Sequence, residues 1–160
     1  MTKAGTEINE YSTVKQLIND SSMKNNNKQF FYMLKMPDCG GNRIKIGKSS
    51  NIYQRFKYYN DHFYNSSVRI LFLRSFNKTL TDRYGDNSKM LYALFEQEAK
   101  KALKKFNNDT ITEWFSGDKE YEIKKAFREF VDEFGNTEYQ KNKLKEKSTR
   151  ERKAPEKYKP

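Results

Sequence analysis

The chain has 160 residues and a formal net charge of +11, which is long enough for one compact domain with extensions and too short for two ordinary domains. Because Cys39 is the only cysteine and His62 the only histidine, an internal disulfide and a cysteine-based zinc site are excluded, and a metal would have to rest on carboxylates and water. No apolar run approaches the ~20 residues of a membrane span and no signal-peptide pattern opens the chain, which predicts a soluble, intracellular protein.

The first 28 residues are predicted to form an extension in front of the domain. Apolar residues at helical spacing between Ile8 and Ile18 predict a short helix that ends by about Asp20. The polar segment 21–28 that follows predicts a linker.

A hairpin is predicted at the start of the domain. The aromatic and aliphatic run in 29–36 predicts a buried strand, and turn-forming residues fill 37–42. Alternation of apolar and polar residues over 43–48 predicts the return strand. Ser49 or Ser50 is then expected to cap a helix that carries apolar residues at three- and four-residue spacing up to Tyr59.

The second half of the domain is predicted to contain one more strand and two helices. The strand, over 68–76, is expected to be central because it is apolar on both faces. The first helix covers 89–106, and the lysines on its polar side form either a solvated face or a surface that follows phosphates. The last helix ends near Phe134, with Gly135 as its C-terminal cap. Between the helices, 113–115 (Glu-Trp-Phe) are expected to close the core.

The predicted fold class is α/β in the α+β sense, with a small three-stranded sheet flanked by helices. The predicted organisation is an N-terminal extension over 1–28, a domain over 29–135 and a basic tail without regular structure over 136–160. The positive charge favours nucleic acid as partner through counterion release, although a lysine-rich surface can also serve solubility alone.

Five short motifs follow one another in the predicted domain: Tyr32-Met33-Leu34-Lys35, Lys45-Ile46-Gly47-Lys48-Ser49, Arg55-Phe56, Glu96 and Glu113-Trp114-Phe115. In this order and at these spacings they resemble the GIY-YIG nuclease superfamily, in the branch common in bacteriophages and large DNA viruses. The resemblance covers about 29–131. It implies a metal-dependent endonuclease that hydrolyses phosphodiester bonds, with double-stranded DNA as the expected partner and Mg²⁺ or Mn²⁺ as the expected cofactor.

The chain departs from the namesake motif at both strands. Phe30-Phe31-Tyr32 stands where the family has Gly-Ile-Tyr, and Lys45-Ile46-Gly47 stands where it has Tyr-Ile-Gly. The resemblance implies that Tyr32 and Lys45 lie beside the attacking water. Lys45 could accept a proton from that water only in its neutral form, which Arg55 and a metal would favour by repulsion. Otherwise Lys45 contacts a phosphate and the domain binds without cutting.

The resemblance implies two further catalytic residues. Arg55 would clamp a phosphate oxygen and stabilise the pentavalent transition state, since its planar fork suits that geometry. Glu96 would bind the metal, and Glu98 is the second choice for this role. Glu96 is preferred because it lies between Phe95 and Ala99 at the edge of the apolar stripe.

Four more residues are predicted to contact nucleic acid, namely Lys35, Lys48, Tyr53 and Lys57. Among the tyrosines of the same helix, Tyr58 and Tyr59 could also stack on bases, although helical spacing places at least one of the three in the core. His62 is either an acid–base group or a solvated loop residue. Two alternatives to a nuclease stay open: a non-catalytic nucleic-acid-binding module on the same fold, and an assembly protein that acts through its basic tail.

Overall fold

The computed structural model of the chain describes residues 5–38, 41–62, 68–76, 87–106, 114–116, 119–136 and 138–146. Its centre is a five-stranded antiparallel sheet with strand order β1-β4-β2-β3-β5. The strands are β1 (Thr6–Glu7), β2 (Gln29–Asp38), β3 (Gly41–Ser49), β4 (Arg69–Phe76) and β5 (Trp114–Ser116). The α+β class is confirmed, and the predicted count of three strands is wrong. The two outer strands are too short to show a period in the sequence.

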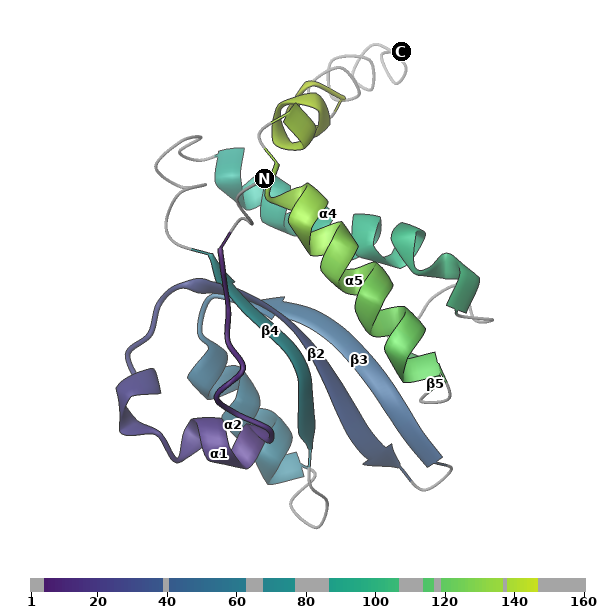
Figure 1. The fold of residues 1–160 in the computed structure, drawn as a ribbon. Helices are drawn as coiled ribbons and strands as arrows, with labels where there is room; N and C mark the ends of the chain where they lie inside the picture. Colours follow the sequence, from purple (N-terminus) through teal and green to yellow (C-terminus); the bar gives the residue numbers. More distant parts are fainter. Residues whose placement is uncertain are drawn as a thin grey trace, which may run out of the picture.

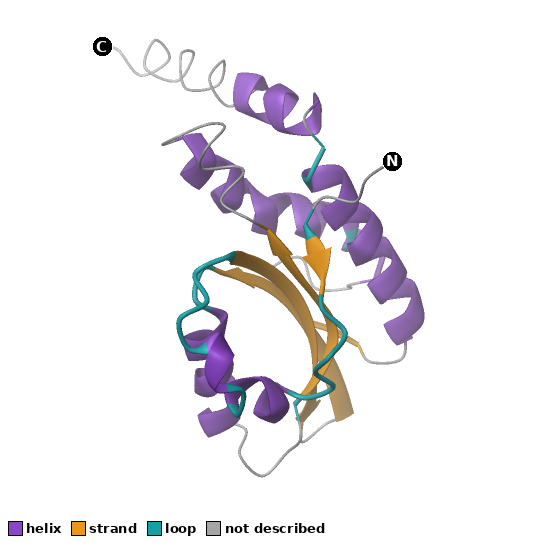
Figure 2. Cartoon of the chain, turned by 60° about the vertical axis from the view of Figure 1, so that its left-hand side comes forward, coloured by secondary structure: helices purple, strands orange, loops and turns teal. Residues whose placement is uncertain are grey.

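The helices form two layers, one on each face of the sheet. α1 (Val14–Ile18) and α2 (Ile52–His62) pack together on one face, and α4 (Asn87–Ala102) and α5 (Glu120–Phe134) cover the other (Figure 1). Two short 3₁₀ turns, η1 (Ser21–Met23) and η2 (Lys104–Phe106), also belong to the regular structure. The strands bend around the layer formed by α1 and α2 (Figure 2). No helix in the described ranges combines the length and apolar composition needed to cross a bilayer.

β2 is the central strand and is buried on both faces. Phe30, Tyr32 and Leu34 belong to the core beneath α1 and α2, whereas Phe31 and Met33 belong to the core beneath α4 and α5. The prediction that 68–76 would be central is therefore wrong by one position. β4 has β2 on one side, and on the other it pairs with the two-residue β1 and, through an isolated bridge from Arg69, with Thr13.

Aromatic rings fill the layer of α4 and α5. The ring of Phe95 on α4 stacks on Phe31 of β2 with their centroids 4.0 Å apart, and Phe134 of α5 meets both rings edge-on. Phe115 of β5 is also buried in this cluster, as expected of the Glu-Trp-Phe segment. Glu113 and the side chain of Trp114 lie outside the described part.

The start of α2 differs from the predicted capping. Asn51, rather than Ser49 or Ser50, caps the helix, because its Oδ1 accepts a hydrogen bond from the backbone N–H of Gln54 at 3.2 Å. Ser49 Oγ accepts the backbone N–H of Asn51 at 3.0 Å and so supports the turn before the helix.

The N-terminal segment is part of the fold. β1 pairs with β4, and α1 contacts α2. The predicted helix from Ile8 is wrong in its first half, since α1 begins only after Thr13. Thr13 caps it through a capping box with Gln16, which stops the helix from extending backwards.

The prediction of an irregular tail from 136 is wrong over 138–146, where the chain forms a further helix. Tyr139 and Leu144 pack against the core beneath α4 and α5, and Gln140 Nε2 donates to the carbonyl of Phe134 at 3.1 Å. So few apolar residues leave no period in the sequence, but they suffice to dock a short helix. Residues 39–40, 77–86 and 147–160 lie outside the described residues.

Candidate phosphate site at the edge of the sheet

The C-terminal part of β3 is an open edge of the described sheet. β5 pairs with β3 only at Arg43, Ile44 and Lys45, so 46–49 have a described partner strand on the β2 side alone. α2 begins three residues after β3 ends. Side chains of β3 and α2 therefore converge at this edge.

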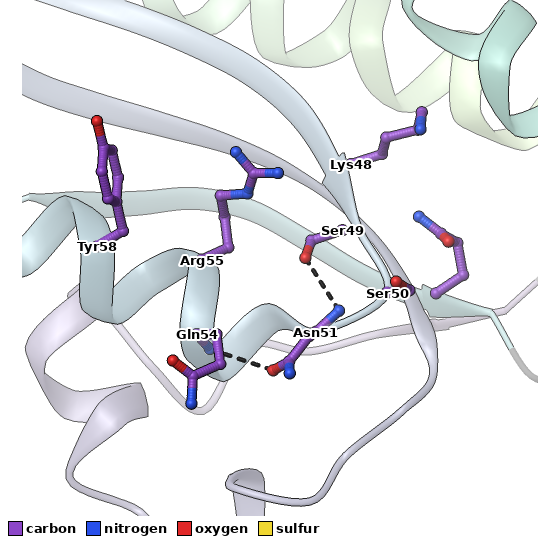
Figure 3. Close-up of a pocket in the computed structure, with 8 residues that line it drawn as sticks. Lys48, Ser49, Ser50, Asn51, Gln54, Arg55 and Tyr58 are labelled. Carbon is purple, nitrogen blue, oxygen red and sulfur yellow. Dashed lines mark hydrogen bonds between the residues drawn. The ribbon is translucent and has the colours of Figure 1, made fainter.

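A pocket of about 570 Å³ opens there. Figure 3 draws the eight residues that line it: Gln29, Lys48, Ser49, Ser50, Asn51, Gln54, Arg55 and Tyr58. Among these described lining residues are two cations and no carboxylate. The lining therefore favours an anionic ligand such as a phosphate group.

The two cations approach the edge from opposite faces of the sheet. Lys48 is the register partner of Phe31, so its side chain lies on the face that α4 and α5 cover. Arg55 is an exposed residue of α2, on the other face. Figure 3 shows Arg55 projecting from α2 towards β3, with Lys48 beyond it.

The N-terminus of α2 adds a third source of positive potential. The first turn of a helix has backbone N–H groups without partners inside the helix, and the helix dipole is positive at this end. Here the capping residue Asn51 is itself part of the pocket lining, together with Ser50. An anion in the pocket would therefore lie beside both the helix terminus and the two side-chain cations.

Tyr32 lies under α2 instead of lining the pocket. Its side chain is 2 % exposed, and its hydroxyl is 2.8 Å from the hydroxyl of Tyr59. The ring covers Gly47, because a Cβ built on Gly47 would lie 2.5 Å from Tyr32 Cζ. Tyr32 therefore contacts both β3, which carries Lys48, and α2, which carries Arg55.

Lys45 is half-buried and also lies outside the pocket lining. In the sheet it stands between Leu34 of β2 and Trp114 of β5, on the same face as Tyr32. Lys45 is thus separated from Lys48 along β3 and from the open part of the edge.

Glu96 and Glu98 are both residues of α4, on the face opposite α2. One helical residue turns the direction by about 100°, so they lie on opposite sides of the buried stripe that contains Phe95 and Ala99. Glu98 forms ion pairs with Lys143 at 3.3 Å and with Lys101 at 3.5 Å. The described residues offer Glu96 neither a hydrogen bond nor an ion pair.

The position of Glu96 relative to Lys48 follows from its neighbour in α4, Phe95. Phe95 stacks on Phe31, and Phe31 is the register partner of Lys48. α4 also contacts β3, whereas α5 contacts β4. Glu96 and Lys48 therefore belong to the same face and the same half of the sheet, while Tyr32 and Arg55 belong to the other face.

The other three residues predicted to contact nucleic acid lie at different places in the fold. Lys35 lies on the side of α5, where its Nζ is 2.7 Å from Glu120 Oε1. Tyr53 is half-buried against the core beneath α1 and α2, and Lys57 is exposed on α2. These three residues lie outside the pocket lining, so their contact with nucleic acid stays a prediction.

Among the three tyrosines of α2 that could stack on bases, Tyr53 was chosen as the predicted site residue, but Tyr58 is the one that lines the pocket. It lines the pocket and is 54 % exposed, whereas Tyr59 is 5 % exposed and belongs to the core. Its position three residues after Arg55, on the same side of a helix, was the available signal. His62 packs on Tyr58 and its Nδ1 is 2.9 Å from the carbonyl oxygen of Tyr58.

No group of three or more histidine, cysteine, aspartate or glutamate side chains in the described ranges could hold a metal ion. The donor that fits the predicted cofactor is a single carboxylate, that of Glu96. Carboxylate oxygen is the ligand that Mg²⁺ and Mn²⁺ prefer, with water completing the coordination.

A small α+β domain with a cationic pocket at a sheet edge defines a class of module suited to binding phosphate groups. Residues 29–134 match the family model of the T5orf172 domain. Because this match spans more than half of the chain, the chain belongs to the T5orf172 family. The domain is found in phage proteins and is associated with nuclease-like families, so the chain carries a nuclease-like or nucleic-acid-binding module. No curated protein and no solved structure matches the chain.

Proposed function

We propose that the protein is a metal-dependent endonuclease of the GIY-YIG type that hydrolyses phosphodiester bonds, with double-stranded DNA as substrate. The observation that carries the proposal is the pocket at the open edge of β3, where Lys48 and Arg55 approach from opposite faces. A pocket lined by cations and a helix terminus, without a lining carboxylate, suits a backbone phosphate.

In this proposal Arg55 clamps the scissile phosphate. Its guanidinium donates two parallel hydrogen bonds to phosphate oxygens, which strengthen as negative charge grows in the pentavalent transition state. Lys48 neutralises charge on the side of the leaving oxygen, and the N-terminus of α2 adds a fixed dipole. The products carry a 5′-phosphate and a 3′-hydroxyl.

Tyr32 and Lys45 are proposed to assist removal of a proton from the attacking water. Lys45 would act in its neutral form, as a base, whereas the Tyr32 hydroxyl would act through hydrogen bonding. Tyr59 holds the Tyr32 hydroxyl by the 2.8 Å contact between them. Both residues lie on the face of the sheet from which Arg55 comes.

Glu96 is proposed to hold the metal ion. A divalent ion held there would supply charge stabilisation at the phosphate and would orient the attacking water. Glu96 has no competing ion pair in the described ranges, whereas Glu98 is engaged by Lys143 and Lys101. This contrast supports Glu96 over Glu98.

A non-catalytic nucleic-acid-binding module on the same fold is the alternative. It is favoured by one observation, that neither Tyr32 nor Lys45 lines the pocket. Such a module would bind nucleic acid with strong dependence on salt and none on Mg²⁺, and Glu96→Ala would bind at least as well as the parent.

The two functions differ in a nicking assay. Supercoiled, linear and single-stranded DNA are incubated with the parent, Glu96→Ala, Arg55→Ala and Glu98→Ala, each with Mg²⁺, Mn²⁺ or a chelator. The parent should nick only with a divalent ion, and Glu96→Ala and Arg55→Ala should lose about 100-fold or more in rate. Glu98→Ala should cut like the parent.

Glu129→Ala is the matched carboxylate control, because Glu129 is exposed on α5. Equal nicking by the parent, Glu96→Ala and Arg55→Ala would assign the activity to a contaminant. Salt-sensitive binding without cleavage under any ion would establish the binding module instead.

A further inference from the structure

We infer that the pocket takes an unpaired nucleotide, whose phosphate is held by Arg55 and Lys48 and whose base stacks on the ring of Tyr58. The inference rests on the proposed function, because it names the form of nucleic acid that this same site accepts. In a duplex substrate the nucleotide would be a bulged, mismatched or extruded one.

Tyr58 presents an open aromatic surface beside the two cations. Among the large apolar side chains of the described ranges, only Tyr58 and Tyr121 are exposed, at 54 % and 76 %. Tyr121 lies on α5, on the other face of the sheet from α2, whereas Tyr58 lines the pocket. Exposed rings next to cations are the elements that bind single-stranded nucleic acid, since every base has a face that can stack.

His62 holds the Tyr58 ring from one side. The two ring centroids are 3.9 Å apart with an interplanar angle of 33°, and the His62 Nδ1 contact to the Tyr58 carbonyl fixes the imidazole. Tyr59 meets the Tyr58 ring edge-on, at 5.9 Å. A ring held in this way loses less conformational entropy when a base stacks on it.

Arg55 and Tyr58 are spaced to contact neighbouring parts of one nucleotide. They are three residues apart on α2, which is about 4.5 Å along the helix axis. Figure 3 shows both side chains projecting in the same direction from α2, with Arg55 between Tyr58 and Lys48. A phosphate at the cations would therefore place its own sugar and base beside Tyr58.

The base must be unpaired for this contact. Inside a duplex both faces of a base are covered by its neighbours, so an aromatic side chain can reach a face only when the base leaves the stack. The pocket volume of about 570 Å³ lies in the range of about 300–1,000 Å³ typical of small-molecule sites. Such a volume can hold one nucleotide.

The test compares two DNA duplexes that differ at one position. In one, a central 2-aminopurine is unpaired as a single-nucleotide bulge, and in the other it is paired with thymine. Binding to the full-length protein is measured by anisotropy in chelator, which prevents cleavage, and stacking is measured by quenching of 2-aminopurine fluorescence. The variants are Tyr58→Ala, Tyr58→Phe and, as matched control, Tyr121→Ala.

The parent should bind the bulged duplex roughly tenfold more tightly or better, which corresponds to the ~1–3 kcal/mol of one base–aromatic stack, and should quench its fluorescence. Tyr58→Ala should lose both the preference and the quenching. Tyr58→Phe, which keeps the ring, and Tyr121→Ala should keep both.

Equal affinity of the parent for the two duplexes, or a preference that survives in Tyr58→Ala, would overturn the inference. The outcome is separable from that of the proposed function. A protein that prefers the bulge through Tyr58 but never cleaves DNA contradicts the nuclease alone. A protein that cleaves DNA with Mg²⁺ and ignores the bulge contradicts this inference alone.

Discussion

Gly47 of β3 lies directly against the ring of Tyr32 on β2: a Cβ on Gly47 would lie 2.5 Å from both Cζ and Oη of Tyr32. The two residues are register partners, so the ring crosses the neighbouring strand at a residue that has no side chain. Phe56 of α2 also packs edge-on against the Tyr32 ring, with the two ring centroids 5.3 Å apart. The Tyr32 ring therefore lies between Gly47 of β3 and Phe56 of α2.

Gly47→Ala should destabilise the protein. The added methyl group would force the buried Tyr32 ring to move, and overpacking of this kind costs about 1–3 kcal/mol. Urea unfolding followed by circular dichroism measures the loss. Combining Gly47→Ala with Tyr32→Leu should cost less than the sum of the two single changes, because the smaller side chain makes room. A Gly47→Ala protein as stable as the parent would show that the ring is not confined.

The Tyr32–Tyr59 hydroxyl pair should behave as a coupled unit. Tyr32→Phe or Tyr59→Phe removes the hydrogen bond between the two hydroxyls and should cost about 0.5–1.5 kcal/mol each, whereas the double change should cost less than their sum. A double-mutant cycle in urea measures the coupling. Tyr121→Phe, on an exposed hydroxyl, is the control and should be neutral; purely additive losses would argue against the hydrogen bond.

Glu7 should make stability depend on pH in the acid range. Burial acts to raise the pKa of Glu7, but hydrogen bonds and charge attraction from Arg128 and Arg74 outweigh it and hold the pKa below its usual value of 4.5. A carboxyl group whose folded-state pKa is lowered stabilises the fold above the unfolded-state pKa, and this contribution is lost as pH falls through the folded-state pKa.

Glu7→Gln should therefore be less stable than the parent at neutral pH, and the difference should shrink and vanish below the lowered pKa. Urea unfolding midpoints between neutral pH and pH ~3 measure this. Asp132, which also pairs with Arg74, is unchanged in both proteins and cancels in the comparison. Glu10→Gln, at an exposed position in the same segment, is the control. A difference that grows towards acid pH would contradict the assignment.

Arg55 should matter for nucleic acid and not for folding. Since Arg55 is exposed, Arg55→Ala should change stability by no more than about 0.5 kcal/mol. The cleavage rate of Arg55→Ala or, if the protein is a binding module, its affinity for nucleic acid should fall. Arg55→Lys should recover only part of the lost rate or affinity, because an ammonium group cannot form the bidentate contact. Anisotropy and nicking measure both effects, with exposed Lys15→Ala on α1 as control. Full activity in Arg55→Lys would show that Arg55 contributes only its positive charge and no bidentate contact.

Much of the fold was predictable from local patterns. The apolar run at 29–36 and the stripes of α4 and α5 are periodic enough to predict strands and helices directly. β1, β5 and the helix at 138–146 were missed, because each is held by contacts with distant segments. β1, for example, exists through its pairing with β4 and the ion pair between Glu7 and the buried Arg74.

The sequence by itself determined which residue types are present and their order, so that Tyr32, Gly47 and Arg55 could be assigned to two strands and a following helix. Only the tertiary structure decided that Tyr32 is buried beneath α2, that Lys48 and Arg55 line one pocket, and that Glu98 pairs with Lys143. The physical reason is register. The face on which a strand residue lies, and the helix it meets, depend on pairing between segments far apart in the chain.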